Sequence, residues 1–329
     1  MSAPNGLRAA VIGAAGYVGG EALRLLLAHP RIGSVRAISR SQSGQRLADV
    51  HPSLEHVTDA RFEEASVEDA SRVSDVVVFA LGHGESKAAI PAVRASSDAL
   101  IVDLAQDFRL DPSFVYALCD PPGANLRGAR RIAAPGCFAT ATLLALYPAA
   151  HRGIVEGLPV SFAITGSSGS GATPKRSTHH PVRAHNVFGY GLDGHRHEAE
   201  IAAQARRWGG PDAACRLLPH SGPFVRGIHV TLRARLAAPL ADPLALYREA
   251  YATRPFVRVL DAPPELSAVV GTNFAHLHAA VRDEGRELIV TCVIDNLVKG
   301  AAGQALQAMN LALGFDETEG LTFPGIYPC

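Results

Sequence analysis

Residues 7–30, LRAAVIGAAGYVGGEALRLLLAHP, decide the fold of the N-terminal part of the chain. They begin with an apolar run of strand length, which leads into a turn marked by Gly13 and Gly16. Leucines then recur at helical spacing until His29-Pro30, and a second apolar run follows at 34–39. This order of strand, glycine turn, helix and strand predicts a βαβ unit, in which the glycines let backbone amides approach a pyrophosphate.

The end of the second predicted strand indicates which dinucleotide would bind. An NAD site usually has Asp or Glu at this point, whereas this chain has Ser39, Arg40 and Ser41. A cation between two hydroxyl donors suits a 2′-phosphate and favours NADP; the alternative is an exposed arginine in a polar loop. Two further strands, predicted at 74–81 and 99–105, continue the same alternating pattern. The loops that follow them either border the ligands or only connect elements.

Length and composition narrow the class of protein. A chain of 329 residues suggests about two domains, and its apolar fraction of 47% allows a sizeable core. The formal charge is zero, which argues against a general affinity for nucleic acid or anionic membranes. No apolar stretch approaches the roughly 18 residues of a membrane span. The five cysteines are scattered without a CxxC pair, which suits a reducing cytoplasm.

The segment AAPGCFATATLLALYP, residues 133–148, carries a candidate nucleophile. Pro135 and Gly136 interrupt the preceding run, and the residues after them have helical composition until Pro148. Cys137 is therefore expected at the N-terminus of an apolar helix, where unsatisfied amides and the helix dipole stabilise a thiolate. The alternative is a small core residue, a common role for a free cysteine.

Motifs along most of the chain resemble those of the N-acetyl-γ-glutamyl-phosphate reductase (ArgC) family. They are, in order, GAAGYVGGEALRLL (13–26), VDLAQDFRL (102–110), PGCFAT (135–140), PHSGPFVRGI (219–228), VVGTNF (269–274) and IDNLVKGAAGQALQAMNLALGF (294–315). One departure is the segment Cys119-Asp120-Pro121-Pro122, where the family commonly has a Leu-Pro-Glu-Leu-Asn type of stretch.

The resemblance implies an NADPH-dependent reduction of an acyl phosphate to an aldehyde through a thioester. It assigns the nucleophile to Cys137 and the acid/base to His220. It implies a cofactor site made of Gly13, Gly16, Tyr17, Val18, Ser39, Arg40, Ser41, Asn296 and Gly300.

The departing phosphate and a substrate carboxylate both need cationic or amide donors. Candidates are Arg109, Arg226 and the glycine-rich loop that contains Ser168 and Gly169. That loop could cradle an anion with its amides or be only a flexible turn.

Residues 175–200, KRSTHHPVRAHNVFGYGLDGHRHEAE, are rich in histidine. Their spacing fits no zinc pattern, so no metal is expected. The segment resembles a region near the substrate and adds His179, Arg183 and His197 to the candidate substrate residues. Its His-His-Pro-x-Arg unit is similar to the LysY-like branch, whose substrate is 2-aminoadipate 6-phosphate held on an acidic amino-group carrier protein (LysW). Lys175 and Arg176, with Arg183, could dock such a carrier.

This carrier-linked reaction of lysine biosynthesis is the function that the segment favours. The alternative is the reduction of N-acetyl-γ-glutamyl phosphate in arginine biosynthesis, or both activities. A remote alternative is a non-enzymatic NADP-binding regulator.

The predicted architecture is α/β. Residues 1–136, joined by 313–329, should form a Rossmann-type, doubly wound parallel sheet that binds NADP. Residues 137–312 should form an α+β catalytic and oligomerisation domain with a mainly antiparallel sheet, similar to glyceraldehyde-3-phosphate dehydrogenase. Alternating runs predict its strands at 158–166, 227–236, 274–282 and 287–295. A broad apolar sheet face and the resemblance together suggest a homodimer or homotetramer.

Overall fold

The computed structural model describes residues 6–123 and 125–328, which form two compact units. The first unit contains the described parts of Met1–Cys119, Ala124–Pro135 and Ala301–Phe323. The second contains Asp120–Gly123, Gly136–Gly300 and the described part of Pro324–Cys329. The chain thus returns to the first unit at Ala301, with its last helix and before position 313. The reason is that helix α9 (Gly303–Leu313) packs on α1, β4 and β6 of the first unit.

The first unit is built on a parallel sheet with the strand order β2-β1-β3-β4-β6-β5. Its strands are β1 (Leu7–Ile12), β2 (Ile32–Ile38), β3 (Val76–Phe79), β4 (Leu100–Asp103), β5 (Val115–Tyr116) and β6 (Arg131–Ala133). The predicted strands correspond to β1–β4, and this order confirms the predicted doubly wound sheet. Strands β5 and β6 are too short to show a hydrophobic period in the sequence.

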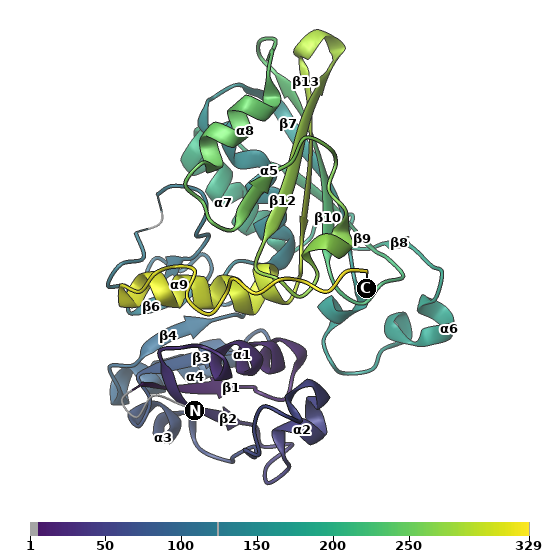
Figure 1. Cartoon of the computed structure of the whole chain (residues 1–329). Helices are drawn as coiled ribbons and strands as arrows, with labels where there is room; N and C mark the ends of the chain where they lie inside the picture. Colours follow the sequence, from purple (N-terminus) through teal and green to yellow (C-terminus); the bar gives the residue numbers. More distant parts are fainter. Residues whose placement is uncertain (1–5, 124, 329) are drawn as a thin grey trace. The chain divides into compact units, whose positions relative to one another are not determined.

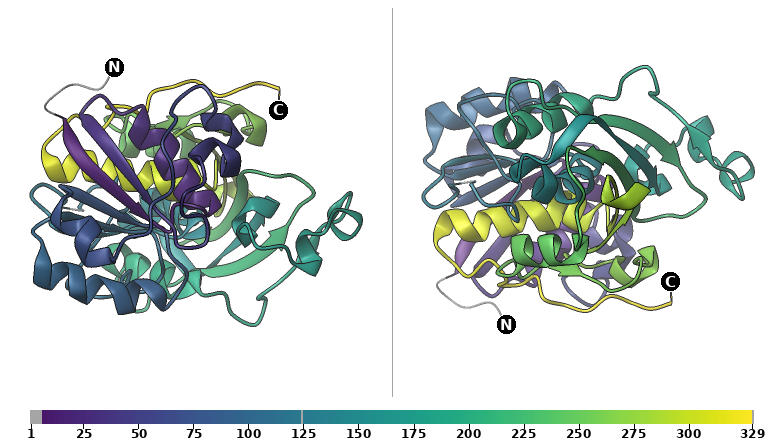
Figure 2. Two further views of the ribbon diagram at one scale, coloured as in Figure 1. Left: turned by 90° about the horizontal axis from the view of Figure 1, so that it is seen from below. Right: turned by 90° about the horizontal axis from the view of Figure 1, so that it is seen from above.

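Helices cover both faces of this sheet. They are α1 (Tyr17–Leu27), α2 (Leu47–Val50), α3 (Val67–Arg72), α4 (Glu85–Ser96) and α9, with a 3₁₀ turn at Pro52–Leu54. Helices α1 and α9 pack together, and so do α3 and α4. Figure 2 shows these two pairs on opposite sides of the strands. Successive residues of β1 point to opposite faces, so Ala10 and Ile12 join the buried cluster that contains Ile90 and Val93 of α4.

The second unit contains a mixed sheet with the strand order β11-β12-β13-β10-β7-β9-β8. Its strands are β7 (Val155–Thr165), β8 (Phe188–Gly189), β9 (Arg216–Ser221), β10 (Ile228–Leu236), β11 (Val257–Val259), β12 (Ala275–Arg282) and β13 (Glu287–Ile294). The predicted strands correspond to β7, β10, β12 and β13. They form antiparallel pairs, whereas β7 pairs with β9, and β11 with β12, in parallel.

Three helices pack on one face of this sheet (Figure 1), namely α5 (Cys137–His151), α7 (His197–Gly209) and α8 (Pro243–Tyr251). Sequence composition placed the end of α5 at Pro148, but the helix continues to His151. Pro148 has no N–H for the carbonyl of Leu144, four residues earlier. The hydroxyl of Tyr251 donates to this carbonyl at 2.6 Å, so the helix continues without an orphaned acceptor.

Short helical turns shape the loops of the second unit. They are the 3₁₀ turns Ser167–Ser170, Arg176–Thr178, Leu266–Val269 and Asp283–Gly285, the short helix α6 (His180–Arg183) and the π turn Val298–Ala302. Within the described part of the chain, every helix is too short or too polar to cross a membrane.

Candidate active site

Cys137 is the first residue of α5, as the sequence predicted. Gly136 is the N-cap residue in extended conformation, and no side chain caps this end of the helix. The amides of the first turn therefore lie next to a half-buried thiol. Such a position favours the thiolate, which is the nucleophilic form of cysteine.

Two glycines are packed tightly around Cys137. A Cβ on Gly300, in the π turn, would lie 2.7 Å from the Cβ of Cys137. A Cβ on Gly136 would lie 2.5 Å from the ring of His197 and 2.6 Å from Oε1 of Glu200. Real Cβ atoms essentially never come within 3.0 Å of another heavy atom, so a larger residue at Gly300 would displace Cys137 itself, and one at Gly136 would displace the side chains of His197 and Glu200.

A buried carboxylate anchors the start of α5. Oε2 of Glu200 accepts the backbone N–H of Gly136 at 3.0 Å, and its Oε1 lies 4.0 Å from Nε2 of His197. Glu200 and His197 are both on α7 and both buried. One helix therefore supplies an imidazole beside Cys137 and the acceptor that fixes the N-cap residue.

A cavity of about 510 Å³ opens at Cys137. Its lining is Cys137, Phe138, Thr165, Gly169, Ser170, Ser177, Phe188, Tyr190, Gly194, His195, Arg196, His197 and Ser221. Thr165, Ser221 and Phe188 are register partners on β7, β9 and β8, so their side chains point to one face of the sheet.

His195 and His197 are the imidazoles of this lining, and their ring centroids are 4.7 Å apart. Nδ1 of His195 accepts the backbone N–H of His197 at 3.2 Å. Burial, with a smaller effect of the neighbouring Arg196, lowers the pKa of His195 to about 4. A neutral imidazole that accepts at Nδ1 carries its proton on Nε2, so His195 is a hydrogen-bond donor at neutral pH.

His220, the residue that the resemblance assigns as acid/base, is on β9 with Nδ1 3.1 Å from the carbonyl oxygen of Leu218. It is the register partner of Gly189, and a Cβ built there would lie 3.5 Å from the His220 ring. Its neighbour Ser221 faces the cavity, so strand alternation directs His220 to the opposite face. The structure thus brings His195 and His197, rather than His220, to the cavity of Cys137.

The residues that the sequence offered for carrier docking differ in exposure. Lys175 and Arg176 are exposed, as is the candidate substrate residue His179, whereas Arg183 is buried. The guanidinium of Arg183 donates to the hydroxyl of Ser221 and to the carbonyl of Gly222. Arg183 therefore stabilises the wall of the cavity through these hydrogen bonds and does not belong to an exposed docking surface.

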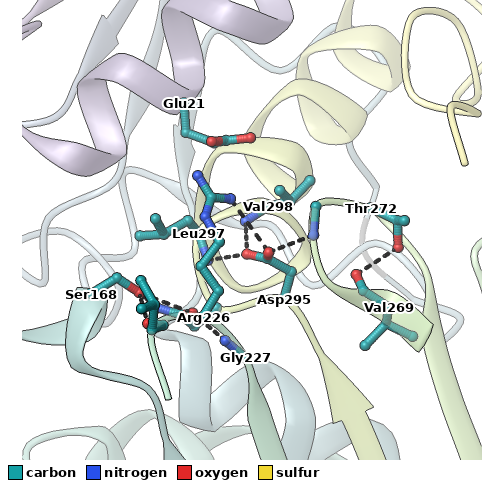
Figure 3. Close-up of polar contacts among 12 residues, drawn as sticks. Glu21, Ser168, Arg226, Gly227, Val269, Thr272, Asp295, Leu297 and Val298 are labelled. Atoms are coloured by element: carbon teal, nitrogen blue, oxygen red, sulfur yellow. Dashed lines mark hydrogen bonds and ion pairs between the residues drawn. The ribbon is translucent and has the colours of Figure 1, made fainter. Parts of the chain in front are cut away.

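The predicted substrate residues Ser168 and Arg226 belong to a buried polar network around residues 295 and 296. Arg226 lies 3.3 Å from Oδ2 of Asp295, whose Oδ1 accepts the backbone N–H groups of Leu297 and Val298. Figure 3 shows these groups converging on the Asp295 carboxylate. The network holds the chain at the entry to the π turn that contains Gly300.

Asn296 joins two loops of the same region. Its Oδ1 accepts the backbone N–H of Gly227 at 2.7 Å, and its Nδ2 donates to Oγ of Ser168 at 3.0 Å. Gly169 follows Ser168 and lines the cavity. The contacts of Asn296 give it a structural role, and its predicted contact with the cofactor stays a prediction.

In the first unit, the loop after β1 has the geometry of a phosphate-binding turn. Gly13 has φ +81°, a conformation that favours glycine, and Gly16 is the N-cap residue of α1. A Cβ on Gly19 would lie 2.4 Å from the carbonyl oxygen of Gly13, so glycine is required for the helix to pack on the loop. The ring of His51, which the sequence did not indicate, contacts the carbonyl oxygen of Ala14 at 2.9 Å.

The N-terminus of α1 presents Tyr17 and Val18, and the end of β2 presents the residues predicted for the 2′-phosphate. Oγ of Ser39 and Oγ of Ser41 are 3.4 Å apart, and Arg40 between them is exposed. No carboxylate within the described ranges forms an ion pair with Arg40. The residues therefore fit a phosphate group at this strand end.

Arg109, another predicted substrate residue, is buried in the first unit. Its guanidinium donates to the carbonyl oxygens of Ala134 at 2.9 Å and Leu104 at 3.1 Å. These bonds tie the loop after β4 to the segment that leads to Cys137. Over residues 6–123 and 125–328, no cluster of three His, Cys, Asp or Glu side chains is arranged to hold a metal ion.

Two domain families match the chain. The family described as "Semialdehyde dehydrogenase, NAD binding domain" matches residues 8–126, and "Semialdehyde dehydrogenase, dimerisation domain" matches residues 137–296. Among solved structures, aspartate semialdehyde dehydrogenase II of Vibrio cholerae has a TM-score of 0.75 at 17% identity, over 93% of this chain and 98% of its own. The enzyme of Candida albicans, solved with NADP, has a TM-score of 0.72 at 16% identity, over 93% and 98%. These structures share the fold.

Closer relatives are proteins named N-acetyl-gamma-glutamyl-phosphate reductase. The protein of Methanosarcina mazei is 38% identical over 98% of this chain and 99% of its own length. The protein of Mycobacterium avium is 40% identical over 98% and 99%. With this similarity along almost its whole length, the chain belongs to the N-acetyl-γ-glutamyl-phosphate reductase family.

Proposed function

We propose that this protein is an NADPH-dependent reductase that converts N-acetyl-γ-glutamyl phosphate to N-acetylglutamate semialdehyde and phosphate. The observation that carries the proposal is the position of Cys137, at the N-terminus of α5 and in a cavity lined by two imidazoles. The relatives carry the name of this enzyme, which supports the free acetylated substrate. They give no support to the carrier-linked substrate that the histidine-rich segment favoured.

The residues of the first unit fit the cofactor. The amides at the start of α1 and the turn at Gly13 would hold the pyrophosphate, and Ser39, Arg40 and Ser41 would hold the 2′-phosphate. When bound, NADPH supplies the hydride that reduces the acyl group.

Cys137 divides the reaction into two easier steps. Its thiolate attacks the acyl carbon, a C–S bond forms, and the C–O bond to phosphate breaks. The product is a thioester on Cys137, whose carbonyl carbon gains a hydride to give the oxyanion of a thiohemiacetal. Re-formation of the C=O bond then breaks the C–S bond, releases the aldehyde and restores the thiolate.

His195 acts in this scheme as a fixed donor. Its Nε2–H can donate to the substrate oxygen, which becomes negative when the thiolate or the hydride adds. Because its pKa is low, the ring stays neutral at working pH, so Nδ1 remains an acceptor and Nε2 carries the proton. Its backbone bond through Nδ1 holds the ring in this orientation.

The reverse reaction tests the proposal. Purified protein is mixed with NADP, inorganic phosphate and N-acetylglutamate semialdehyde, and formation of NADPH is followed at 340 nm. We expect turnover that requires both phosphate and the semialdehyde. A parallel sample contains carrier-linked aminoadipate semialdehyde, and turnover with that substrate alone would overturn the assignment. Equal rates without phosphate would exclude an acyl phosphate as the product.

We also infer that the protein forms a homo-oligomer through the outer face of the seven-stranded sheet. The matched family is described as a dimerisation domain. On β7, Leu158 and Phe162 are 52% and 45% exposed. Large exposed apolar side chains that are grouped on one surface support a protein–protein contact.

A further inference from the structure

One wall of the Cys137 cavity is a row of side chains across three strands. Ser221 of β9 pairs with Thr165 of β7 on one side and with Phe188 of β8 on the other. All three line the cavity, and Ser221 is only 4% exposed. The hydroxyl of Ser221 is thus a buried polar group in the wall of the cavity, between Thr165 and the ring of Phe188.

Arg183 lies directly behind this wall. Its guanidinium donates to Oγ of Ser221, to the carbonyl of Gly222 and, at 3.5 Å, to the carbonyl of Thr165. It also lies over the ring of Phe188, 5.8 Å from the centroid. Arg183 is 7% exposed, so this positive charge is held inside the second unit.

In the described part of the chain, the charge of Arg183 has no acidic partner. Among the described residues no carboxylate forms an ion pair with it, and its buried Nε has no hydrogen-bond partner. A buried charge is costly unless a counter-charge or several hydrogen bonds compensate for it. Two carbonyls and a hydroxyl compensate only partly, so the site is electrostatically incomplete without an anion.

The direction of the bond between Arg183 and Ser221 decides what Ser221 can do. A guanidinium has only donors, so Oγ of Ser221 must be the acceptor. The hydroxyl hydrogen remains available, and within the described ranges no acceptor takes it. Because Ser221 lines the cavity, that hydrogen can be donated to a ligand there.

We propose that Ser221, polarised by Arg183, donates a hydrogen bond to an anionic oxygen of the substrate and so determines substrate affinity. The inference rests on the proposed function and names a further recognition residue for it. Ser221 contacts the substrate, and Arg183 is a positioning residue that acts through it. An acyl phosphate of this class has two anionic groups, a phosphate and a carboxylate, and either provides the required chemistry.

The reverse reaction separates these two anions, because phosphate and the semialdehyde carboxylate then enter on different molecules. KM is measured for each with the other saturating, in wild type and in Ser221→Ala. A hydrogen bond to a charged group is strong enough that its loss should raise one KM by about ten-fold or more, with a smaller change in kcat. A rise in the KM for semialdehyde identifies the carboxylate, and a rise in the KM for phosphate identifies the phosphate.

Conservative variants separate recognition from packing. Ser221→Thr retains the hydroxyl and should keep the affected KM within about three-fold of wild type, whereas Arg183→Met should raise the same KM as Ser221→Ala. Ser34→Ala, at an exposed serine of the first unit, is the matched control. If Arg183→Met does not fold, the two Ser221 variants still decide the question.

The proposal is overturned if both KM values of Ser221→Ala stay within two-fold of wild type. This result differs from failure of the proposed function, in which the wild-type protein itself shows no phosphate-dependent turnover.

Discussion

Cys137 is held in place by contacts that leave no room for larger neighbours. Gly300 approaches Cys137, and Gly136 approaches the side chains of His197 and Glu200, so closely that a Cβ at either glycine would overlap these neighbours. The carboxylate of Glu200 then fixes the N-cap residue from the side of α7. The position of the thiol is therefore set by close backbone packing and by one buried hydrogen bond, rather than by a flexible loop.

The imidazole that serves Cys137 can be identified by two matched variants. His195→Ala removes the donor that we propose for the developing oxyanion, and such a loss typically lowers kcat by about 10²–10³. His220→Ala should change kcat by less than about five-fold, because His220 is on the other face of β9. Steady-state kinetics of the reverse reaction measure both, with circular dichroism to confirm folding. A larger loss in His220→Ala than in His195→Ala would restore the assignment made from the resemblance.

The sequence indicated Cys137 and His197 but not His195, and it could not show on which face of the sheet His220 lies, because that depends on strand alternation. The break at Pro135 and Gly136 predicts a helix start, so the thiol position follows from local sequence alone. His220 is different, because its direction depends on whether residues 216–221 form a strand. They do, as β9, but Pro219 interrupts the pattern, and the pairing partner β7 lies far away in the sequence.

At the scale of elements, the π turn Val298–Ala302 is fixed by a buried ion pair. Nζ of Lys299 lies 2.7 Å from Oδ2 of Asp120, and both side chains are fully buried. Asp120 belongs to the segment that departs from the family pattern, and the structure shows that its carboxylate compensates the lysine. Gly300, next to Lys299, contacts Cys137, so the ion pair supports the nucleophile indirectly.

Removing one member of this ion pair should be costly. We expect Lys299→Met to lower the free energy of unfolding by about 3–5 kcal/mol, because it leaves an uncompensated carboxylate in the core. The double variant Asp120→Leu with Lys299→Met should recover most of that loss, since apolar side chains can replace a buried pair. Urea denaturation of the single and double variants measures the coupling. Additive losses would show that the two side chains do not act as a pair.

The carboxyl end of β4 gives a prediction on pH. Burial raises the pKa of Asp103 to about 6, from its ordinary value of 3.8. Because its pKa is raised in the folded state, the protonated Asp103 carboxyl contributes to the free energy of unfolding. This contribution is complete below pH 3.8 and is lost as pH rises through about 6. The stability of wild type relative to Asp103→Asn should therefore fall by about 1 kcal/mol between pH 5 and pH 8. Urea denaturation at both pH values measures this; a pH-independent difference would contradict it.

Elements long enough to show a hydrophobic pattern could be predicted from the sequence, and shorter elements could not. The runs that became β1–β4, β7, β10, β12 and β13 each alternate or are continuously apolar. Strands β5, β8 and β11 have two or three residues, so their existence depends on tertiary pairing. The extension of α5 beyond Pro148 also depends on a distant residue, Tyr251.

At the scale of the whole molecule, the outer face of the seven-stranded sheet predicts self-association. Phe162→Lys places a charge on this face and should convert the oligomer to a monomer, as measured by size-exclusion chromatography with light scattering. Val57→Lys, at an equally exposed apolar residue of the first unit, is the matched control and should leave the mass unchanged. A monomeric wild-type protein, or an unchanged mass in Phe162→Lys, would contradict this interface.

The proposed mechanism requires that Cys137 carries the acyl group as a thioester. Mass spectrometry of the intact protein tests it most directly, after mixing with N-acetyl-γ-glutamyl phosphate in the absence of NADPH. We predict one acyl group and one released phosphate per chain, with the group located on Cys137 by peptide mapping and lost when NADPH is added. Cys137→Ser should show no adduct. A wild-type protein that turns over normally but never carries the acyl group on Cys137 would contradict the proposed mechanism.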